Sequence, residues 1–207
     1  MSEQIEERFD ESARGTIKNL RANGFEVTCF ETAAQAAAYV GQQLHGRTVG
    51  IGGSMSVRAA DMYTAVKDDN EVFWHMVVPG DETMVRASCA QVYITSVNAI
   101  SSEGFLVNID GRGNRVAGTL MKKDKVYLLC GKNKLAGPLS EALDRARNIA
   151  APQNAARLEM KTPCVKGGHC YDCRSPERIC NALVILWRKP FWCESMEILL
   201  TEEELGF

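Results

Sequence analysis

Four of the eight cysteines in this 207-residue chain lie in one short segment near its carboxyl-terminal end. The segment reads PCVKGGHCYDCRSPERIC, from Pro163 to Cys180, and the gaps between its cysteines are five, two and six residues. Thiols this close in sequence can bind a metal, form a redox pair or form disulfides. The candidate metal ligands are Cys164, Cys170, Cys173 and Cys180.

The expected compartment and the spacing favour a metal over the other uses of these thiols. The opening sequence MSEQIEERFDES is polar and acidic, unlike a secretory signal, so we expect a cytoplasmic protein with reduced thiols. Structural zinc commonly uses two close cysteine pairs, and only Cys170 and Cys173 form one here. Four thiolates with these gaps suit a [4Fe–4S] cluster better. Zinc is the alternative, and free or disulfide-bonded thiols are a third interpretation.

A glycine-rich loop in the first third of the chain has the composition of an anion site. Arg47 to Ile51 reads as a short buried strand, and Gly52-Gly53-Ser54 leads from it into a helix. Such a loop leaves backbone N–H groups free for an anion, and Ser54 can cap the helix while contacting a phosphate or carboxylate. The dinucleotide-binding fingerprint is absent, because its third glycine would fall on Met55. A tight turn with a serine cap is the alternative interpretation.

A second polar loop follows the strand-like segment Phe105 to Ile109. It reads DGRGNR, from Asp110 to Arg115, and holds more charge and more hydrogen-bonding groups than a turn requires. Asp110 is the best candidate for acid–base catalysis, with a turn-forming Asx residue as the alternative. If these loops share one edge of a sheet, they form a mildly basic cleft for a small anionic or phosphorylated metabolite. The predicted ligand-binding residues are Gly52, Gly53, Ser54, Asn98, Asp110, Gly113, Asn114, Arg115 and Lys134.

The elements that must position these loops alternate between strands and helices. This alternation predicts an α/β fold with a mostly parallel sheet and helices on both faces. We expect strands near 25–30, 47–51, 72–76, 92–95, 105–109, 125–130, 183–187 and 196–200, and helices near 5–20, 32–44, 54–65, 81–90, 139–149 and 152–160.

Length and charge limit the organisation and the partners. A chain of 207 residues with 45% hydrophobic residues fits one domain, 1–207, that includes the cysteine segment at 160–185. A net charge of −2 gives no sign of a nucleic-acid surface, and the longest apolar runs are too short to cross a bilayer. We therefore expect neither nucleic-acid binding nor membrane insertion, and a homodimer is left open.

Three stretches resemble a known family. GIGGSMSV, TSVNAISSEGFLVNIDGRGNRVAG and VYLLCGKNKLAG, in this order, resemble the LUD domain of the lactate-utilisation protein C type. The resemblance covers roughly 5–151 and continues into APQNAARL and the cysteine segment. It implies a Rossmann-like sandwich of the sugar-phosphate isomerase and CoA-transferase type. It also implies a role in oxidation of L-lactate to pyruvate alongside iron–sulfur partner proteins.

Three functions stay open at this point. The first is a lactate-utilisation component that binds a small anionic metabolite and docks onto a redox partner through the cysteine segment. The second is a transferase or isomerase acting on a phosphorylated or CoA-linked substrate, for which Glu103 is the only glutamate near the polar loops. The third is a non-catalytic assembly subunit with a structural metal. Whether the chain is itself an enzyme is therefore open.

Overall fold

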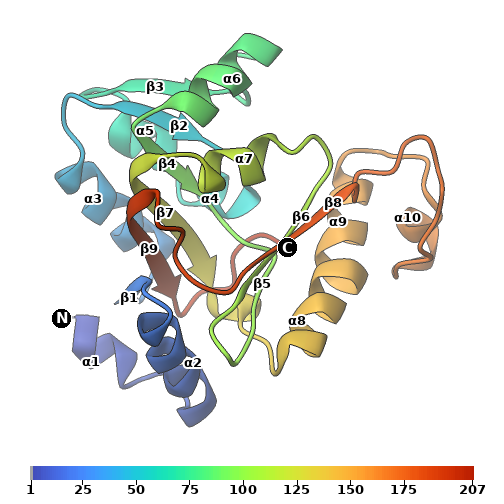
Figure 1. The fold of residues 1–207 in the computed structure, drawn as a ribbon, viewed down its shortest axis with the longest axis horizontal. Helices are drawn as coiled ribbons and strands as arrows, with labels where there is room; N and C mark the ends of the chain where they lie inside the picture. Colours follow the sequence, from blue (N-terminus) through green and yellow to red (C-terminus); the bar gives the residue numbers. More distant parts are fainter. Residues whose placement is uncertain (1) are drawn as a thin grey trace.

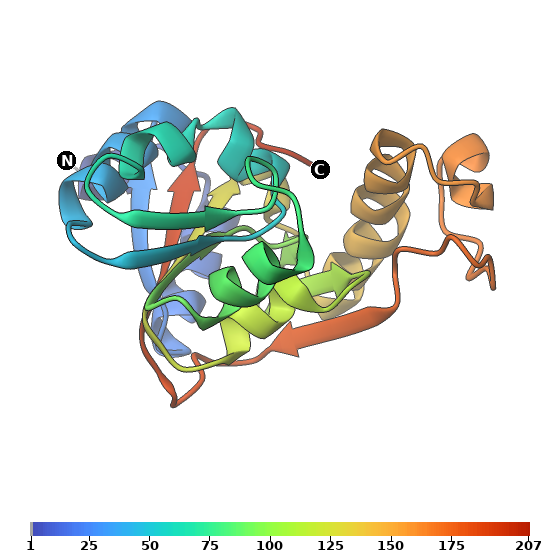
Figure 2. The ribbon, with the colours of Figure 1, turned by 90° about the horizontal axis from the view of Figure 1, so that it is seen from above.

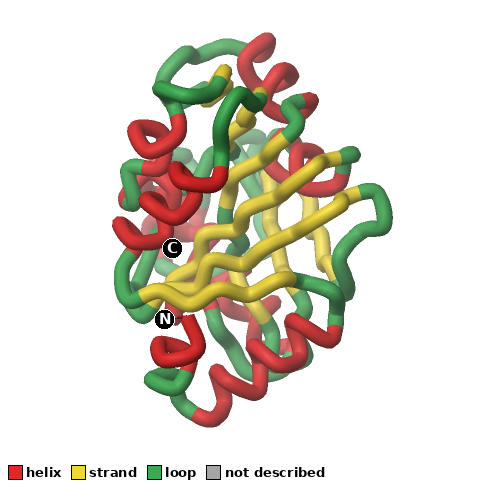
Figure 3. The backbone as a smooth tube through the Cα atoms, turned by 90° about the vertical axis from the view of Figure 1, so that its left-hand side faces the viewer, coloured by secondary structure: helices red, strands yellow, loops and turns green. Residues whose placement is uncertain are grey.

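A six-stranded parallel sheet forms the centre of the computed structural model, which describes residues 2–207 (Figure 3). The strand order is β1-β9-β7-β4-β2-β3, and every neighbouring pair is parallel. The bounds are Glu26–Phe30 for β1, Thr48–Ile51 for β2, Glu71–Trp74 for β3, Val92–Thr95 for β4, Lys123–Gly131 for β7 and Cys193–Thr201 for β9. The predicted α/β architecture is confirmed.

Alternate side chains of the central strands enter two separate hydrophobic cores. On β7, Val126 and Leu128 pack in the core that includes α2, whereas Tyr127 and Leu129 pack in the core that includes α3, α4 and α5. Helices therefore cover both faces of the sheet, as predicted (Figure 1). The bounds are Glu11–Ala22 for α2, Ala33–Gln43 for α3, Met55–Ala59 for α4, Met62–Val66 for α5, Asp81–Cys89 for α6 and Asn114–Leu120 for α7.

The amino-terminal segment forms two helices where the apolar spacing predicted one. Helix α1 spans Ser2–Glu6, and α2 begins after Asp10. The Asp10 side chain accepts a hydrogen bond from the Ala13 N–H at 2.8 Å, so it caps a new helix. Ile5 and Phe9 are nevertheless both buried, which explains why the apolar pattern continues across the break.

Two of the expected strands, β6 and β8, belong to a second, antiparallel sheet and not to the parallel sheet. Strand β6, Leu106–Asp110, pairs antiparallel with β5, Ala99–Ile100, on one side and with β8, Ala182–Leu186, on the other. The register places Asp110 opposite Ala182. This pairing joins the polar loop after β6 to the end of the cysteine segment.

A helical run stands to one side of the sheet and carries the cysteine segment (Figure 2). Helix α8, Leu139–Arg145, continues through a π-helical turn, Ala146–Ala150, into α9, Ala151–Arg157. A short helix, α10, follows at Pro163–Gly167. None of the helices in residues 2–207 is long and apolar enough to cross a bilayer.

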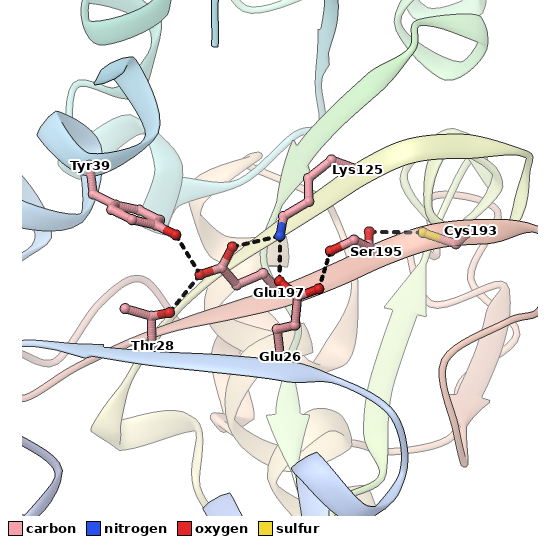
Figure 4. A network of polar contacts seen from close by, with 7 residues as sticks. All are labelled: Glu26, Thr28, Tyr39, Lys125, Cys193, Ser195 and Glu197. Atoms are coloured by element: carbon pink, nitrogen blue, oxygen red, sulfur yellow. Dashed lines mark hydrogen bonds and ion pairs between the residues drawn. The ribbon is translucent and has the colours of Figure 1, made fainter. Parts of the chain in front are cut away.

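A buried carboxylate on β9 organises a polar network on the α3 side of the sheet (Figure 4). Glu197 is 2% exposed and accepts hydrogen bonds from the hydroxyls of Thr28 at 2.6 Å and Tyr39 at 3.1 Å. The Lys125 ammonium lies 2.8 Å from Glu197 and 2.6 Å from Glu26. Burial opposes the charge of Lys125, but the hydrogen bonds with Glu197 and Glu26 outweigh it and raise the pKa of Lys125. Lys125 therefore supplies the positive charge that both carboxylates of this network share.

Candidate anion-binding cleft

A cleft of about 670 Å³ opens at the carboxyl ends of the central strands. Its walls come from the loops after β2, β3, β4 and β6, from α9, and from the end of the cysteine segment. Ligands of open α/β sheets collect at this edge, because strand-to-helix loops leave polar groups free there. The cleft is therefore the candidate functional site of this chain.

The cleft brings together most of the residues that the sequence predicted as ligand-binding. Ser54 and Asp110 line the same cavity, so the expectation that the two glycine loops share one edge is confirmed. Gly52 and Gly113 lie one residue away from lining positions. That these residues bind an anion stays a prediction. The predicted residues that line the cleft are Gly53, Ser54, Asn98, Asp110, Asn114, Arg115 and Lys134.

Positive charge is concentrated in this cleft, although the chain as a whole carries a net charge of −2. Only two carboxylates, Asp110 and Glu177, stand among the lining residues. An excess of cations in a concave site raises the local concentration of anions. The cationic residues that line the cleft are Arg112, Arg115, Lys134, Arg157 and Arg178.

The loop after β2 uses its glycines for close approach and its serine as a helix cap. A Cβ at Gly52 would lie 2.7 Å from the Thr95 hydroxyl, and one at Gly53 would lie 3.2 Å from the His75 ring. Ser54 accepts a hydrogen bond from the Val57 N–H at 3.3 Å and so caps α4. The capping interpretation of Ser54 is confirmed, and its contact with an anion remains a prediction.

Asp110 has a structural role in the loop after β6. Its carboxylate accepts hydrogen bonds from the N–H groups of Arg112 at 3.1 Å, Gly113 at 2.9 Å and Val116 at 3.1 Å. Gly113 has a φ of 83°, a left-handed conformation that favours glycine. The Asx-turn alternative therefore describes this geometry. Because both carboxylate oxygens already accept backbone N–H groups, Asp110 is a poor candidate for proton transfer.

Arg115 ties the loops after β4 and β6 together. Its guanidinium donates to the Ser96 oxygen at 3.0 Å, Asn108 Oδ1 at 2.8 Å, Asn98 Oδ1 at 3.0 Å and the Ile109 oxygen at 2.5 Å. Four of the five N–H donors of an arginine are thus used, and only Nε is unpartnered among residues 2–207. All four acceptors are neutral. Arg115 therefore contributes positive charge to the cleft, whereas most of its hydrogen bonds are used within the fold.

Lys134 lies beneath the cleft and is only 3% exposed. Its ammonium group donates to the main-chain oxygen of Phe207, and no Asp or Glu carboxylate in residues 2–207 lies within 4.0 Å of it. Burial first, and then the charge of Arg145, lower the pKa of Lys134 to about 7; Cys130 opposes them, and Arg115 adds a smaller lowering effect. Lys134 and Arg115 thus form a cationic floor, and within residues 2–207 neither has an Asp or Glu partner within 4.0 Å, although the charge of Asp110 acts on Arg115.

The sequence did not identify His75 or Arg157 as cleft residues. His75 was expected inside a strand, but β3 ends at Trp74, and the imidazole follows it at the carboxyl edge. Burial, followed by the charge of Arg112, lowers the pKa of His75. Its position at a strand end was the available signal. Arg157 reaches the cleft from α9, a separate part of the fold, and no local pattern indicates that.

Glu103 does not line the cleft. Its carboxylate instead accepts a hydrogen bond from the Leu139 N–H at 3.3 Å, at the beginning of α8. The transferase hypothesis therefore loses its expected glutamate. Glu177, at the end of the cysteine segment, is the glutamate that does line the cavity.

The four cysteines of the carboxyl-terminal segment are unbridged and half-buried. Cys164 Sγ lies 3.2 Å from the Thr162 hydroxyl, and Cys170 Sγ lies 3.7 Å from the Arg147 guanidinium. The Arg178 side chain donates to the main-chain oxygens of Cys173 at 2.7 Å and Cys180 at 2.9 Å. The two arginines also lie 3.5 Å from Asp172, so they hold the loop together.

The four thiols do not converge as the spacing predicted. Within residues 2–207, no group of three or more His, Cys, Asp or Glu side chains is arranged to hold a metal ion. Separate hydrogen bonds hold Cys164 and Cys170, and thiols have no attraction for one another that would gather them before a metal binds. The donor chemistry fits a soft metal, whereas ligation requires the loop to rearrange. Metal binding itself stays a prediction.

Comparisons with known proteins identify a family match and one similar fold. The LUD domain family matches residues 13–200, which confirms the resemblance found in the sequence. A crystal structure of a DUF162 family protein from Deinococcus radiodurans has a TM-score of 0.55 and 14% sequence identity, covering 92% of this chain and 96% of that one. At this identity the likeness concerns the fold. No curated protein matches the chain.

Proposed function

Since the chain belongs to the LUD domain family, which is associated broadly with lactate utilisation, we propose that it is a component of L-lactate oxidation to pyruvate whose cleft binds a small anionic metabolite. One observation carries the proposal. Lys134 and Arg115 lie in the cleft, and no Asp or Glu carboxylate in residues 2–207 lies within 4.0 Å of either group. Buried cations are normally paired, so an unpaired set at a ligand-binding edge is suited to an anion from outside.

The cleft residues have distinct tasks in this proposal. The permanent charge of Arg115 attracts the carboxylate that lactate and pyruvate share, Lys134 lines the same cavity, and the Arg112 side chain adds positive charge. Asn98 and Ser96 present polar groups to the same cavity. Oxidation of lactate releases two electrons, so the proposal includes iron–sulfur partner proteins that accept them.

The cysteine segment is proposed to bind a metal, with a [4Fe–4S] cluster favoured and zinc as the alternative. Cys164, Cys170, Cys173 and Cys180 would be its ligands. Their support is chemical: four unbridged thiols in one loop, with the Arg147 and Arg178 side chains close enough to offset thiolate charge. When bound, such a group would order the loop and, as a cluster, could exchange single electrons.

The cleft is tested by calorimetry with lactate, pyruvate and inorganic phosphate at fixed ionic strength. Arg112→Gln removes a lining cation that takes no part in the Arg115 network, and we expect affinity to fall about tenfold or more, as for loss of a charge-assisted hydrogen bond. Arg47→Gln is the matched control, because Arg47 is an exposed arginine that pairs with Asp124 and does not line the cleft. Equal loss in both variants, or no anion binding by the parent chain, would count against the proposal.

The metal is tested separately, on protein prepared without oxygen. Iron, sulfide and zinc analysis of the parent chain is compared with Cys173→Ser and with Cys89→Ser, which changes an exposed cysteine outside the segment. We expect metal loss and faster proteolysis within residues 160–185 only in Cys173→Ser. Identical metal content in all three proteins would remove the metal from the proposal.

The size of the cleft favours a second candidate, a transferase or isomerase acting on a phosphorylated or CoA-linked substrate. A volume of about 670 Å³ is typical of sites for ligands larger than a three-carbon acid. This alternative carries with it the finer fold assignment, a sandwich of the sugar-phosphate isomerase and CoA-transferase type. Pyrophosphate and coenzyme A, titrated beside lactate, separate the two. Binding of neither group of ligands would favour the third function, an assembly subunit.

A further inference from the structure

Lys134 is the single lysine among the residues that line the cleft, and its surroundings differ from those of an ordinary ion-pairing lysine. It is buried, it has no Asp or Glu carboxylate within 4.0 Å in residues 2–207, and its side chain is close enough to Arg145 and Arg115 to experience both charges. The guanidinium of Arg145 is itself fixed by the main-chain oxygens of Asn133, at 2.6 Å, and Asn98. The environment of Lys134 is therefore rigid and positive.

Such an environment favours the neutral amine. Burial removes the water that stabilises an ammonium ion, and the two neighbouring guanidinium groups repel it, so the pKa of Lys134 falls to about 7. A lysine desolvated next to other cations is a nucleophile at neutral pH, because its nitrogen lone pair is free. One N–H of Lys134 is directed to the main-chain oxygen of Phe207, which leaves the lone pair for a ligand.

We propose that Lys134 is a covalent binding residue that forms an imine with the carbonyl carbon of a small 2-oxo acid held in the cleft. The inference rests on the proposed function, because the cationic cleft must first hold the carboxylate of the acid. The amine nitrogen attacks the carbonyl carbon and a C–N bond forms. The carbonyl oxygen then takes up one proton from the attacking nitrogen and one from solvent and leaves as water, and the product is a protonated imine. The step involves no oxidation or reduction.

Imine formation brings one negative and one positive charge into the site, and both have a partner there. The ligand brings one negative carboxylate into a floor that holds the charges of Arg115 and Arg145, and the imine nitrogen regains the positive charge that the free amine had lost. A hydroxy acid of the same skeleton has no carbonyl group and can bind only through its carboxylate. Lys134 would thus distinguish a 2-oxo acid from the corresponding 2-hydroxy acid.

The competing role for Lys134 is a simple cationic anchor. As an ammonium ion it would attract the carboxylates of lactate and pyruvate alike, and no covalent product would form. A reductive trap separates the two roles, because hydride converts an imine to a stable secondary amine and leaves a non-covalent complex unchanged.

The full chain is incubated with pyruvate and cyanoborohydride at neutral pH and analysed by intact-mass and peptide mass spectrometry. We expect one adduct, on Lys134, whose added mass is that of pyruvic acid less one oxygen atom. Lactate should give none. Lys134→Arg keeps the positive charge and cannot form the imine, so it should lose the adduct. The matched control Lys132→Arg changes an exposed lysine in the same turn and should keep it.

Calorimetry without reductant, run on the same samples, separates this inference from the proposed function. Pyruvate binding with no adduct would overturn the role of Lys134 and leave the anion site intact. An adduct spread over surface lysines, or one that persists in Lys134→Arg, would overturn it as well. Absence of both binding and adduct would overturn the inference together with the anion-binding cleft.

Discussion

Lys125 and Lys134 both lie beside the parallel sheet with little access to solvent, yet their electrostatic surroundings are opposite. Lys125 is paired with Glu26 and Glu197, whose hydrogen bonds raise its pKa in spite of burial. Lys134 donates to an oxygen of Phe207, and burial together with the charges of Arg145 and Arg115 lowers its pKa, although Cys130 opposes them. The first lysine is paired with two carboxylates inside the fold. The second has no Asp or Glu carboxylate within 4.0 Å in the described part of the chain and lies at the carboxyl edge of the sheet.

The comparison distinguishes a lysine that stabilises the fold, Lys125, from one that lowers its stability, Lys134. Glu197 sits within β9, so the Lys125 network joins neighbouring strands and a helix in the middle of the sheet. Lys134 follows β7 at its carboxyl end, where it lines the cleft. An unpaired buried cation weakens the folded state, and such groups cluster at functional sites. The contrast between the two lysines can therefore be tested by changing each one.

The largest expected effect is in the pH dependence of Lys134→Met. Below pH 7 Lys134 is charged in both states, and the folded state carries the full penalty. Between the folded pKa of about 7 and the ordinary value of 10.5, only the unfolded chain holds the proton, so the free energy of unfolding of the parent chain rises with pH. Relative to Lys134→Met, the parent should gain roughly 3–5 kcal/mol between pH 6 and pH 10.

This change is measured by urea unfolding of both proteins across that pH range. Subtracting the two curves cancels every other titrating group that the proteins share. If the difference stayed constant with pH, Lys134 would be an ordinary charged lysine, and the contrast with Lys125 would fail.

The next effect is the loss of stability in Lys125→Met. This change leaves the nearly buried Glu197 carboxylate without its cation, although Thr28 and Tyr39 still donate to it. We expect a loss of about 3 kcal/mol in the free energy of unfolding, because breaking a buried pair leaves an uncompensated charge. Lys18→Met, at an exposed position of α2, is the control and should change stability little. Equal values for the two variants would contradict the interpretation that Lys125 compensates the buried Glu197 carboxylate.

Arg115→Met should have an intermediate effect and separates charge from structure within the cleft. It removes four hydrogen bonds and leaves the oxygens of Ser96, Asn108 and Ile109 without that donor. We expect a loss of about 2 kcal/mol in stability together with weaker phosphate binding. Thermal unfolding and calorimetry on the same protein report the two effects. Weaker binding at unchanged stability would mean that the hydrogen bonds of Arg115 serve the ligand alone.

The smallest effect is expected for Asp110→Ala, which removes the acceptor for three backbone N–H groups at the beginning of α7. A lost cap of this kind lowers stability by about 1 kcal/mol. Asp110→Asn, which keeps one side-chain oxygen as acceptor, should retain part of that stability. Chemical denaturation of the three proteins provides the measurement. A variant as stable as the parent would show that the turn does not depend on this carboxylate.

The sequence predicted those parts of the cleft that local signals encode. Gly52 to Ser54 and Asp110 to Arg115 stand where an apolar strand ends and polar or glycine residues begin, so their positions follow from short-range patterns. The parallel sheet followed from the same alternation. His75 was missed because the predicted end of β3 was two residues too late, and strand ends are the least certain part of such a prediction.

The remaining parts depend on contacts between distant segments. Nothing near Arg157 or Arg178 indicates that α9 and the cysteine segment form a wall of the cleft. The pairing of β6 with β8 is equally non-local, since it joins strands on either side of the α8–α9 run. The Glu197 network runs against the expectation for a central strand, because a charged residue there is stabilised only by partners from β1, β7 and α3.

The π-helical turn between α8 and α9 sets an angular offset between the two ends of this helical run. A π turn holds one more residue than an α turn, and each residue of an α-helix advances the side chains by about 100°. Ahead of the turn, Arg145 lies next to Lys134; beyond it, Asn154 and Arg157 line the cleft. Removing one residue from 146–150 would restore α-helical phase and swing Asn154 and Arg157 around the helix axis, away from the cleft. The wide turn thus works as a fixed rotation that directs Arg145 towards Lys134 and Arg157 towards the cleft.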